Sequence, residues 1–267
     1  MGRRYLFVGL KLKGARAVKM AVCIKRAADM ETRFKIAANG TSVDETGVKF
    51  DIADFDGFAV EAALQLKEKE SAGEVTVISL GPDTVQETLR KALSMGADKA
   101  VHLKADAVPA DALAIARVLA DELKGGGYDL VFFGRMAIDA ANQSVGPMTA
   151  ELLGVPCVSA ASELTIANGR GTARRELEGA AEVLEFPLPA VVTIDEGIAR
   201  PRLPSLKGIM AAKKKPLEVK PAQVGASRVN VIKMELPPER TGGRIIGEGP
   251  AAVPELVRLL QTEAKVL

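Results

Sequence analysis

The sequence has very little of the residue types that usually build chemical centres. It has no tryptophan, one histidine (His102) and two cysteines (Cys23 and Cys157) in 267 residues. Two cysteines are too few for a disulfide scaffold, which favours a reducing compartment. A single histidine excludes a metal centre with several histidine ligands and a histidine relay. We expect Cys23 to be a small core residue and His102 a surface residue of a strand.

Membrane-spanning runs and the common nucleotide motifs are missing as well. The apolar runs are far shorter than the roughly 20 residues that a membrane-spanning helix needs, so we expect no membrane insertion. No GxGxxG follows the first predicted strand and no GxxxxGK[ST] occurs, which excludes the usual dinucleotide fingerprint and the P-loop. A self-contained enzyme or sensor that binds ATP would need such a glycine-rich loop, and it is the weaker alternative below.

Positive charge is concentrated at the start of the chain. Residues 1–19 hold six Lys and Arg and no acid, so the rest of the chain has 30 basic and 34 acidic residues, a net charge of −4. That balance argues against nucleic acid as a partner. The basic segment resembles a transit peptide but has no Ser or Thr. Alternatively, translation starts at Met20 and residues 1–19 are an extension outside the fold.

From Met20 onward the chain alternates between strand-like and helix-like patterns. Apolar runs such as "MAVCIK", "EVTVISLGP" and "DLVFFG" alternate with amphipathic segments such as residues 55–69. This pattern predicts an α/β fold with a doubly wound, mostly parallel, Rossmann-like sheet that binds an adenine nucleotide. Residues 162–195 predict a β-meander that extends the sheet, with turns at Asn168-Gly169 and Glu178-Gly179.

The predicted domain covers residues 20–210 and is followed by an extended arm. Residues 211–267 contain few helix-length segments before a final amphipathic helix at about 251–265. The arm contains Val229, Ile232 and Ile245, so it is too apolar to favour a disordered tail. We expect it to pack on a partner chain.

A polar loop follows the strand "DLVFFG" at the edge where such sheets bind ligands. Residues 134–154 read "GRMAIDAANQSVGPMTAELLG", and Asp139, Asn142, Gln143 and Ser144 precede a helix whose first turn suits Pro147. Helix N-termini at the carboxyl ends of parallel strands bind phosphates, so a nucleotide is the natural ligand. The alternative is a capped helix without a ligand, in which Asp139 is a helix-entry cap rather than a ribose or metal ligand.

Several separated motifs give the chain a resemblance to a known family. They are "CIKRAAD", "GVKFDIADFDGFAVEAALQLKE", "LSMGADKAVHL", "GRMAID", "RRELEGAAEVLEFPLPAVVTIDEG", "PRLPSLKGIMAAKKKP" and "PPERTGG". In this order they resemble the beta (small) subunit of electron transfer flavoprotein. The resemblance implies a heterodimer with a larger alpha subunit that holds most of the FAD. It also implies an AMP in this subunit, or a second FAD in electron-bifurcating or confurcating members.

The resemblance also implies which residues contact the nucleotide. The contacting stretches fall on Cys23, Ala53, Asp54, Phe55, Asp56, Leu80, Gly134, Arg135, Met136, Ala137, Ile138, Asp139, Asn142, Gln143, Ser144 and Val145. The chain departs from the family pattern at Asp54, Met136, Ala140, Ala141 and Ser144, which removes an acid and two side-chain amides from the loop. The alanines at 140 and 141 leave open a scaffold with an empty pocket.

A docking loop at residues 195–206 is implied by the same resemblance. In "DEGIARPR" the exposed aliphatic anchor is Ile198, flanked by Arg200 and Arg202. This loop would dock on acyl-CoA dehydrogenases, and a downstream oxidoreductase would take the electrons. The chain would then be an electron carrier without catalytic residues of its own. We expect it in the bacterial cytoplasm or, alternatively, in the mitochondrial matrix.

Overall fold

The protein is built around one nine-stranded sheet. The computed structural model describes residues 17–29, 31–70, 72–238 and 242–267, so most of the basic segment 1–19 lies outside the described residues. Across the sheet the strands are β11 (Leu217–Pro221), β5 (Lys99–Lys104), β4 (Glu74–Gly81), β1 (Lys19–Cys23), β6 (Leu130–Gly134), β10 (Ala190–Ile194), β7 (Cys157–Ala167), β8 (Arg170–Leu177) and β9 (Ala180–Pro187). All pairs from β11 to β7 are parallel, so the predicted α/β fold is confirmed.

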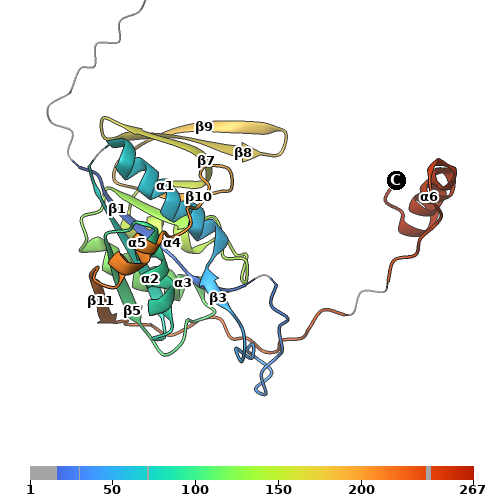
Figure 1. Ribbon diagram of the computed structural model, residues 1–267, viewed down its shortest axis with the longest axis horizontal. Helices are drawn as coiled ribbons and strands as arrows, with labels where there is room; N and C mark the ends of the chain where they lie inside the picture. The colour runs from blue at the N-terminus through green and yellow to red at the C-terminus, as the bar shows by residue number, and fades with distance from the viewer. Residues whose placement is uncertain (1–16, 30, 71, 239–241) are drawn as a thin grey trace, which may run out of the picture.

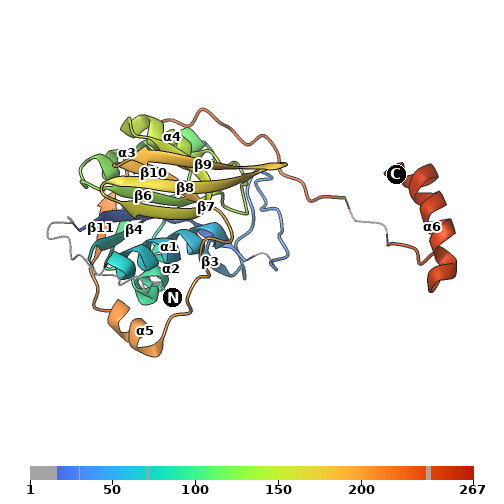
Figure 2. The ribbon, with the colours of Figure 1, turned by 90° about the horizontal axis from the view of Figure 1, so that it is seen from above.

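Helices cover both faces of the parallel part of the sheet (Figure 2). On one face, α1 (Asp54–Glu70) and α2 (Val85–Met95) pack on side chains such as Val22 and Val77. On the other face, α3 (Ala112–Lys124) and α4 (Val145–Leu153) pack on side chains such as Ile78 and Phe133. Because strands with two covered faces have no solvent side, they consist of continuous apolar runs.

An antiparallel ribbon extends the sheet beyond its parallel part. The strands β7, β8 and β9 form consecutive hairpins that turn at the predicted Asn168-Gly169 and at Gly179, all with positive φ. The prediction of a meander is wrong for the last strand, because β10 leaves the ribbon and lies parallel between β6 and β7. All five residues of β10 are buried, and such a strand needs cover on both faces, which the centre of the sheet provides.

The sheet also continues past residue 210. After α5 (Leu206–Ala212), which packs beside α2, β11 adds a parallel strand to the edge at β5. The remaining chain crosses the body, where the N–H of Arg228 donates to Asp111 Oδ2 at 2.8 Å. It then leads to α6 (Val253–Leu259), which stands apart from the body (Figure 1). That this arm packs on a partner stays a prediction.

None of the helices in the described part of the chain is both long and apolar enough to pass through a membrane.

Two short strands, β2 (Arg26–Ala28) and β3 (Phe50–Ile52), form a separate antiparallel pair that leads from β1 into α1. This pair fixes where α1 starts, and the start of α1 is part of the site described next.

Candidate functional site

The strand order creates a crevice at the carboxyl ends of β1 and β6. From β1 the chain continues to β4 on one side, whereas β6 pairs with β1 on the other side. Open α/β sheets bind ligands at such a switch point. Four of the predicted contact residues gather there: Cys23 ends β1, Gly134 ends β6, Leu80 lies near the end of β4 and Asp56 lies in the first turn of α1.

The carboxylate of Asp56 joins the two strand ends. It accepts hydrogen bonds from the N–H of Lys25 at 2.7 Å and from the N–H of Gly134 at 2.8 Å, and the residue is only 6% exposed. Burial raises the pKa of Asp56 to about 7, although the two N–H groups and the charge of Lys25 act in the opposite direction. The sequence had indicated Asp56 only as part of a contacting stretch.

Close approach of α1 to β6 requires glycine at position 134. A Cβ at this position would lie 2.5 Å from the backbone nitrogen of Asp56 and 2.5 Å from the carbonyl carbon of Phe55. No Cβ atom tolerates such distances, so the bond between Asp56 and the end of β6 depends on this glycine.

A phosphate cradle, which we define as the N–H groups of Ser144, Val145 and Gly146, opens α4. None of these three N–H groups donates a hydrogen bond to another residue that the structure describes. Gln143 has a left-handed φ of 50° and Ser144 a right-handed conformation, so the chain turns sharply here, and successive N–H groups in such a turn can form an anion-binding concavity. Together with the positive end of the helix dipole, this arrangement fits a phosphate group.

Three side chains can be compared with what the sequence led us to expect of them. Asp139 does not cap α4; its carboxylate binds Lys25 Nζ at 2.7 Å, beside the crevice. Cys23 is a core residue as expected, and burial raises the pKa of its thiol. The expectation for His102 is wrong: it is fully buried, with Nε2 2.8 Å from the carbonyl oxygen of Gly81, because α2 and β11 cover this part of β5.

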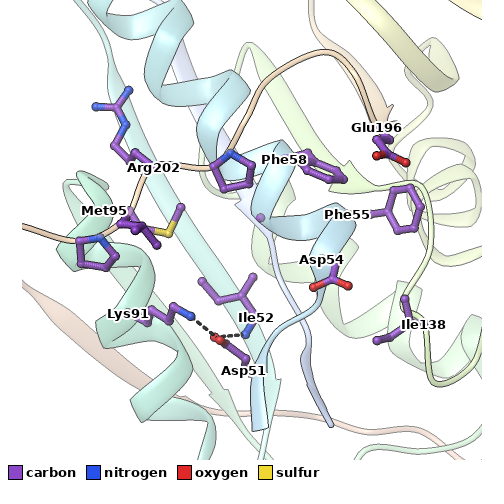
Figure 3. Close-up of a pocket in the computed structure, with 14 residues that line it drawn as sticks. Asp51, Ile52, Asp54, Phe55, Phe58, Lys91, Met95, Ile138, Glu196 and Arg202 are labelled. Atoms are coloured by element: carbon purple, nitrogen blue, oxygen red, sulfur yellow. Dashed lines mark hydrogen bonds and ion pairs between the residues drawn. The ribbon is translucent and has the colours of Figure 1, made fainter. Parts of the chain in front are cut away.

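A second hollow lies beside the crevice, next to the predicted docking loop (Figure 3). It has a volume of about 460 Å³, and three of the predicted nucleotide residues line it: Asp54, Phe55 and Ile138. The remaining lining residues are Asp51, Ile52, Gly57, Phe58, Lys91, Met95, Glu196, Pro201, Arg202, Leu203 and Pro204. The predicted nucleotide residues therefore divide between the crevice and this apolar pocket.

The docking residues also differ in their surroundings. Ile198 is not exposed as expected; it is half-buried and packs against the core on the α1 face. Leu203 and Leu206 are instead 91% and 83% exposed. Arg200 is exposed, whereas the guanidinium of Arg202 binds two carboxylates of α1, at 2.8 Å for Glu61 and 2.6 Å for Glu68.

Within the described ranges, no group of three or more His, Cys, Asp and Glu side chains could hold a metal ion. The arrangement can bind a phosphate at the cradle and an apolar group in the pocket.

Comparisons with known proteins find relatives that match most of the chain. A family model described as "Electron transfer flavoprotein domain" matches residues 40–224. The electron transfer flavoprotein subunit beta of Bacillus subtilis is 36% identical over 260 residues, covering 94% of this chain and 100% of the relative. The subunit of the same name from Syntrophomonas wolfei is 36% identical over 250 residues, with 93% and 98% covered. The human one is 40% identical over 233 residues, with 85% and 91% covered.

Proposed function

The chain belongs to the beta-subunit family of electron transfer flavoproteins, and on that premise we propose that it pairs with an alpha subunit and binds AMP in the crevice. It also helps to hold the FAD of its partner. The heterodimer passes electrons from acyl-CoA dehydrogenases to a downstream oxidoreductase. The chain itself contributes binding and positioning rather than a catalytic acid, base or nucleophile.

The observation that carries the AMP proposal is the phosphate cradle. Its N–H groups have no acceptor in the described chain, so a phosphate would satisfy three donors at once. These donors belong to the backbone, which explains how the site could keep its ligand although Ala140 and Ala141 lack polar side chains. Cys23, Ala53 and Leu80 are buried at the strand ends and offer an apolar surface to an adenine ring.

The apolar pocket is the part of this chain that we assign to the flavin side of the complex. FAD, when bound, supplies the electron-transfer chemistry. Phe55 and Ile138 would pack against an apolar part of the cofactor and exclude water from it. The docking loop borders the same pocket, so a dehydrogenase docked there would lie close to the electron carrier.

Co-expression with the gene for the alpha subunit tests this proposal. The purified complex is denatured and its released nucleotides are quantified. One FAD and one AMP per heterodimer are the expected result. Two FAD would mean a bifurcating or confurcating complex with a second flavin in the crevice, and release of no adenine nucleotide besides one FAD would contradict a ligand in this subunit.

A compartment follows only from the proposed partners. A complex that accepts electrons from acyl-CoA dehydrogenases would work in the same compartment as they do, which is the bacterial cytoplasm or, as the alternative, the mitochondrial matrix. Fractionation of cells that carry the tagged chain distinguishes the two.

A further inference from the structure

We propose that Arg202 and Arg135 are positioning residues that clamp the docking loop at its two ends, so that neither is a contact for the dehydrogenase. This inference rests on the docking function proposed above and deepens it. It also replaces the expectation that Arg202 flanks the anchor as a docking charge, and it gives Arg135 a role other than nucleotide contact.

At the C-terminal end of the loop, Arg202 is held by two carboxylates of α1. Its backbone N–H and its Nε donate to Glu61 Oε2 at 3.2 and 2.8 Å, and its Nη2 donates to Glu61 Oε1 at 2.9 Å. Nη1 and Nη2 donate to Glu68 at 2.6 and 3.1 Å. These bonds use all but one of the N–H donors of the guanidinium. A partner's carboxylate would therefore find almost no free donor on Arg202.

The burial of Glu61 makes this clamp specific. Glu61 is 3% exposed, whereas Glu68 is much more exposed. If Arg202 moved away, water could solvate the carboxylate of Glu68 but not that of Glu61. Burial alone would raise the pKa of Glu61, but hydrogen bonds from Arg202 and Gln65 outweigh it and lower the pKa. The hydrogen bonds that Arg202 donates to both carboxylates raise its own pKa in turn. The pair is therefore charged over the whole physiological range.

At the N-terminal end, Arg135 connects the loop to the nucleotide site. Its Nη1 donates to Asp195 Oδ2 at 2.7 Å, and its guanidinium carbon lies 5.0 Å from the ring centroid of Phe55. The backbone N–H of Arg135 donates to the carbonyl oxygen of Ile194 at 2.8 Å. The guanidinium of Arg135 is thus turned toward the docking loop, although the residue belongs to the segment that the family resemblance assigns to the nucleotide.

Between the two clamps the loop has little else to hold it. In the described chain, the backbone of residues 197–201 makes no hydrogen bond to another backbone group. In this stretch Ile198 packs on the core and Pro201 lies near Gly57. The conformation of the loop, and with it the position of Ile198, thus depends on the arginine–carboxylate pairs at its ends.

Hydrogen exchange of the intact heterodimer tests the clamps directly. In Arg202→Ala we expect the amide of residue 202, which donates to Glu61 Oε2 in the wild type, to exchange about tenfold to hundredfold faster, because the side-chain hydrogen bonds that hold the loop at Glu61 are lost. Arg200→Ala is the matched control, since Arg200 lies on the same loop, is exposed, and pairs with no carboxylate among the residues that the structure describes. Arg202→Lys keeps the positive charge but lacks the paired N–H donors of a guanidinium. The exchange rate of the amide of residue 202 in this variant should therefore lie between those of the wild type and Arg202→Ala. Asp195→Asn should loosen the other end.

Electron transfer from a dehydrogenase gives a second measurement. An open loop lowers the fraction of docking-competent molecules, so Arg202→Ala should raise KM for the dehydrogenase about tenfold with kcat and bound FAD retained. Arg200→Ala should change the exchange of the loop little.

Two results would overturn the clamp. One is unchanged exchange of the amide of residue 202 in both Arg202→Ala and Arg202→Lys. The other is an equal rise of KM in Arg200→Ala and Arg202→Ala without faster loop exchange, which would make both arginines direct contacts. If the wild-type complex takes no electrons from a dehydrogenase, the proposed function fails, and hydrogen exchange still decides whether the clamp exists.

Discussion

Replacing Gly134 with alanine tests whether the contact between α1 and the end of β6 is as close as the structure shows. The new Cβ would lie 2.5 Å from the Asp56 nitrogen and 2.6 Å from Asp56 Oδ1. Relief of this overlap costs about 1–3 kcal/mol, and moving Asp56 away leaves buried polar groups without their hydrogen bond, which costs about 1–3 kcal/mol. We therefore expect a loss of about 3–5 kcal/mol in the free energy of unfolding, or roughly 10 °C in Tm.

The matched control is the same substitution at Gly57, one residue after Asp56 in α1. A Cβ there would meet Pro201 Cγ at 3.6 Å, an ordinary contact, and alanine favours a helix by about 1 kcal/mol. Urea denaturation of the two variants and the wild type, with nucleotide content measured on the same samples, makes the comparison. Gly134→Ala should also release the nucleotide, whereas Gly57→Ala should keep it. Equal stability of the two variants would refute the reasoning.

Three further predictions concern charge, docking and the arm. Because burial raises the pKa of Asp56 to about 7, its contribution to stability is present below the usual pKa of an Asp and is lost as pH rises to about 7. Wild type should lose on the order of 4 kcal/mol over this window and Asp56→Asn should not, as urea midpoints at several pH values will show. Ile198→Asp should raise KM for an acyl-CoA dehydrogenase at least tenfold while bound flavin is retained; an unchanged KM in a steady-state assay would contradict the anchor. Removal of residues 242–267 should change the free energy of unfolding of the body by less than about 1 kcal/mol, since only Leu259 of α6 is buried. The same truncation should reduce co-purification of the alpha subunit. Full retention of the alpha subunit would show that the arm is not part of the interface.

Local patterns were sufficient to predict most helices and the parallel strands. Runs such as "DLVFFG" are apolar because β6 is covered on both faces. Such a strand can therefore be recognised from its own residues, without knowledge of its neighbours in the sheet. The place of β10 could not be predicted in this way, because its neighbours β6 and β7 come from distant parts of the chain. The same holds for β11, whose residues are all half-buried or exposed and whose partner β5 lies far away in the chain.

The candidate site was predictable as a place but not in its contacts. Loops after parallel strands meet at one edge, so the crevice followed from the alternating pattern. The role of Asp56 did not, because its partners Lys25 and Gly134 are 31 and 78 residues away and act through backbone N–H groups. Arg202 resembled a free surface charge because Glu61, which binds it, lies 141 residues earlier on a helix face.

The position of β10 has a consequence for how the protein folds. β6 lies beside β10 in the finished sheet, yet β7, β8 and β9 are made between them. Until residue 194 has been synthesised, β6 and β7 each keep an unpaired edge, and open edges promote aggregation. The crevice residues come mostly from the first half of the chain, but a fragment that ends before β10 would hold them on an incomplete sheet. Folding of this subunit is therefore a late event of its synthesis, and its rate should be limited by the long-range pairing of β10.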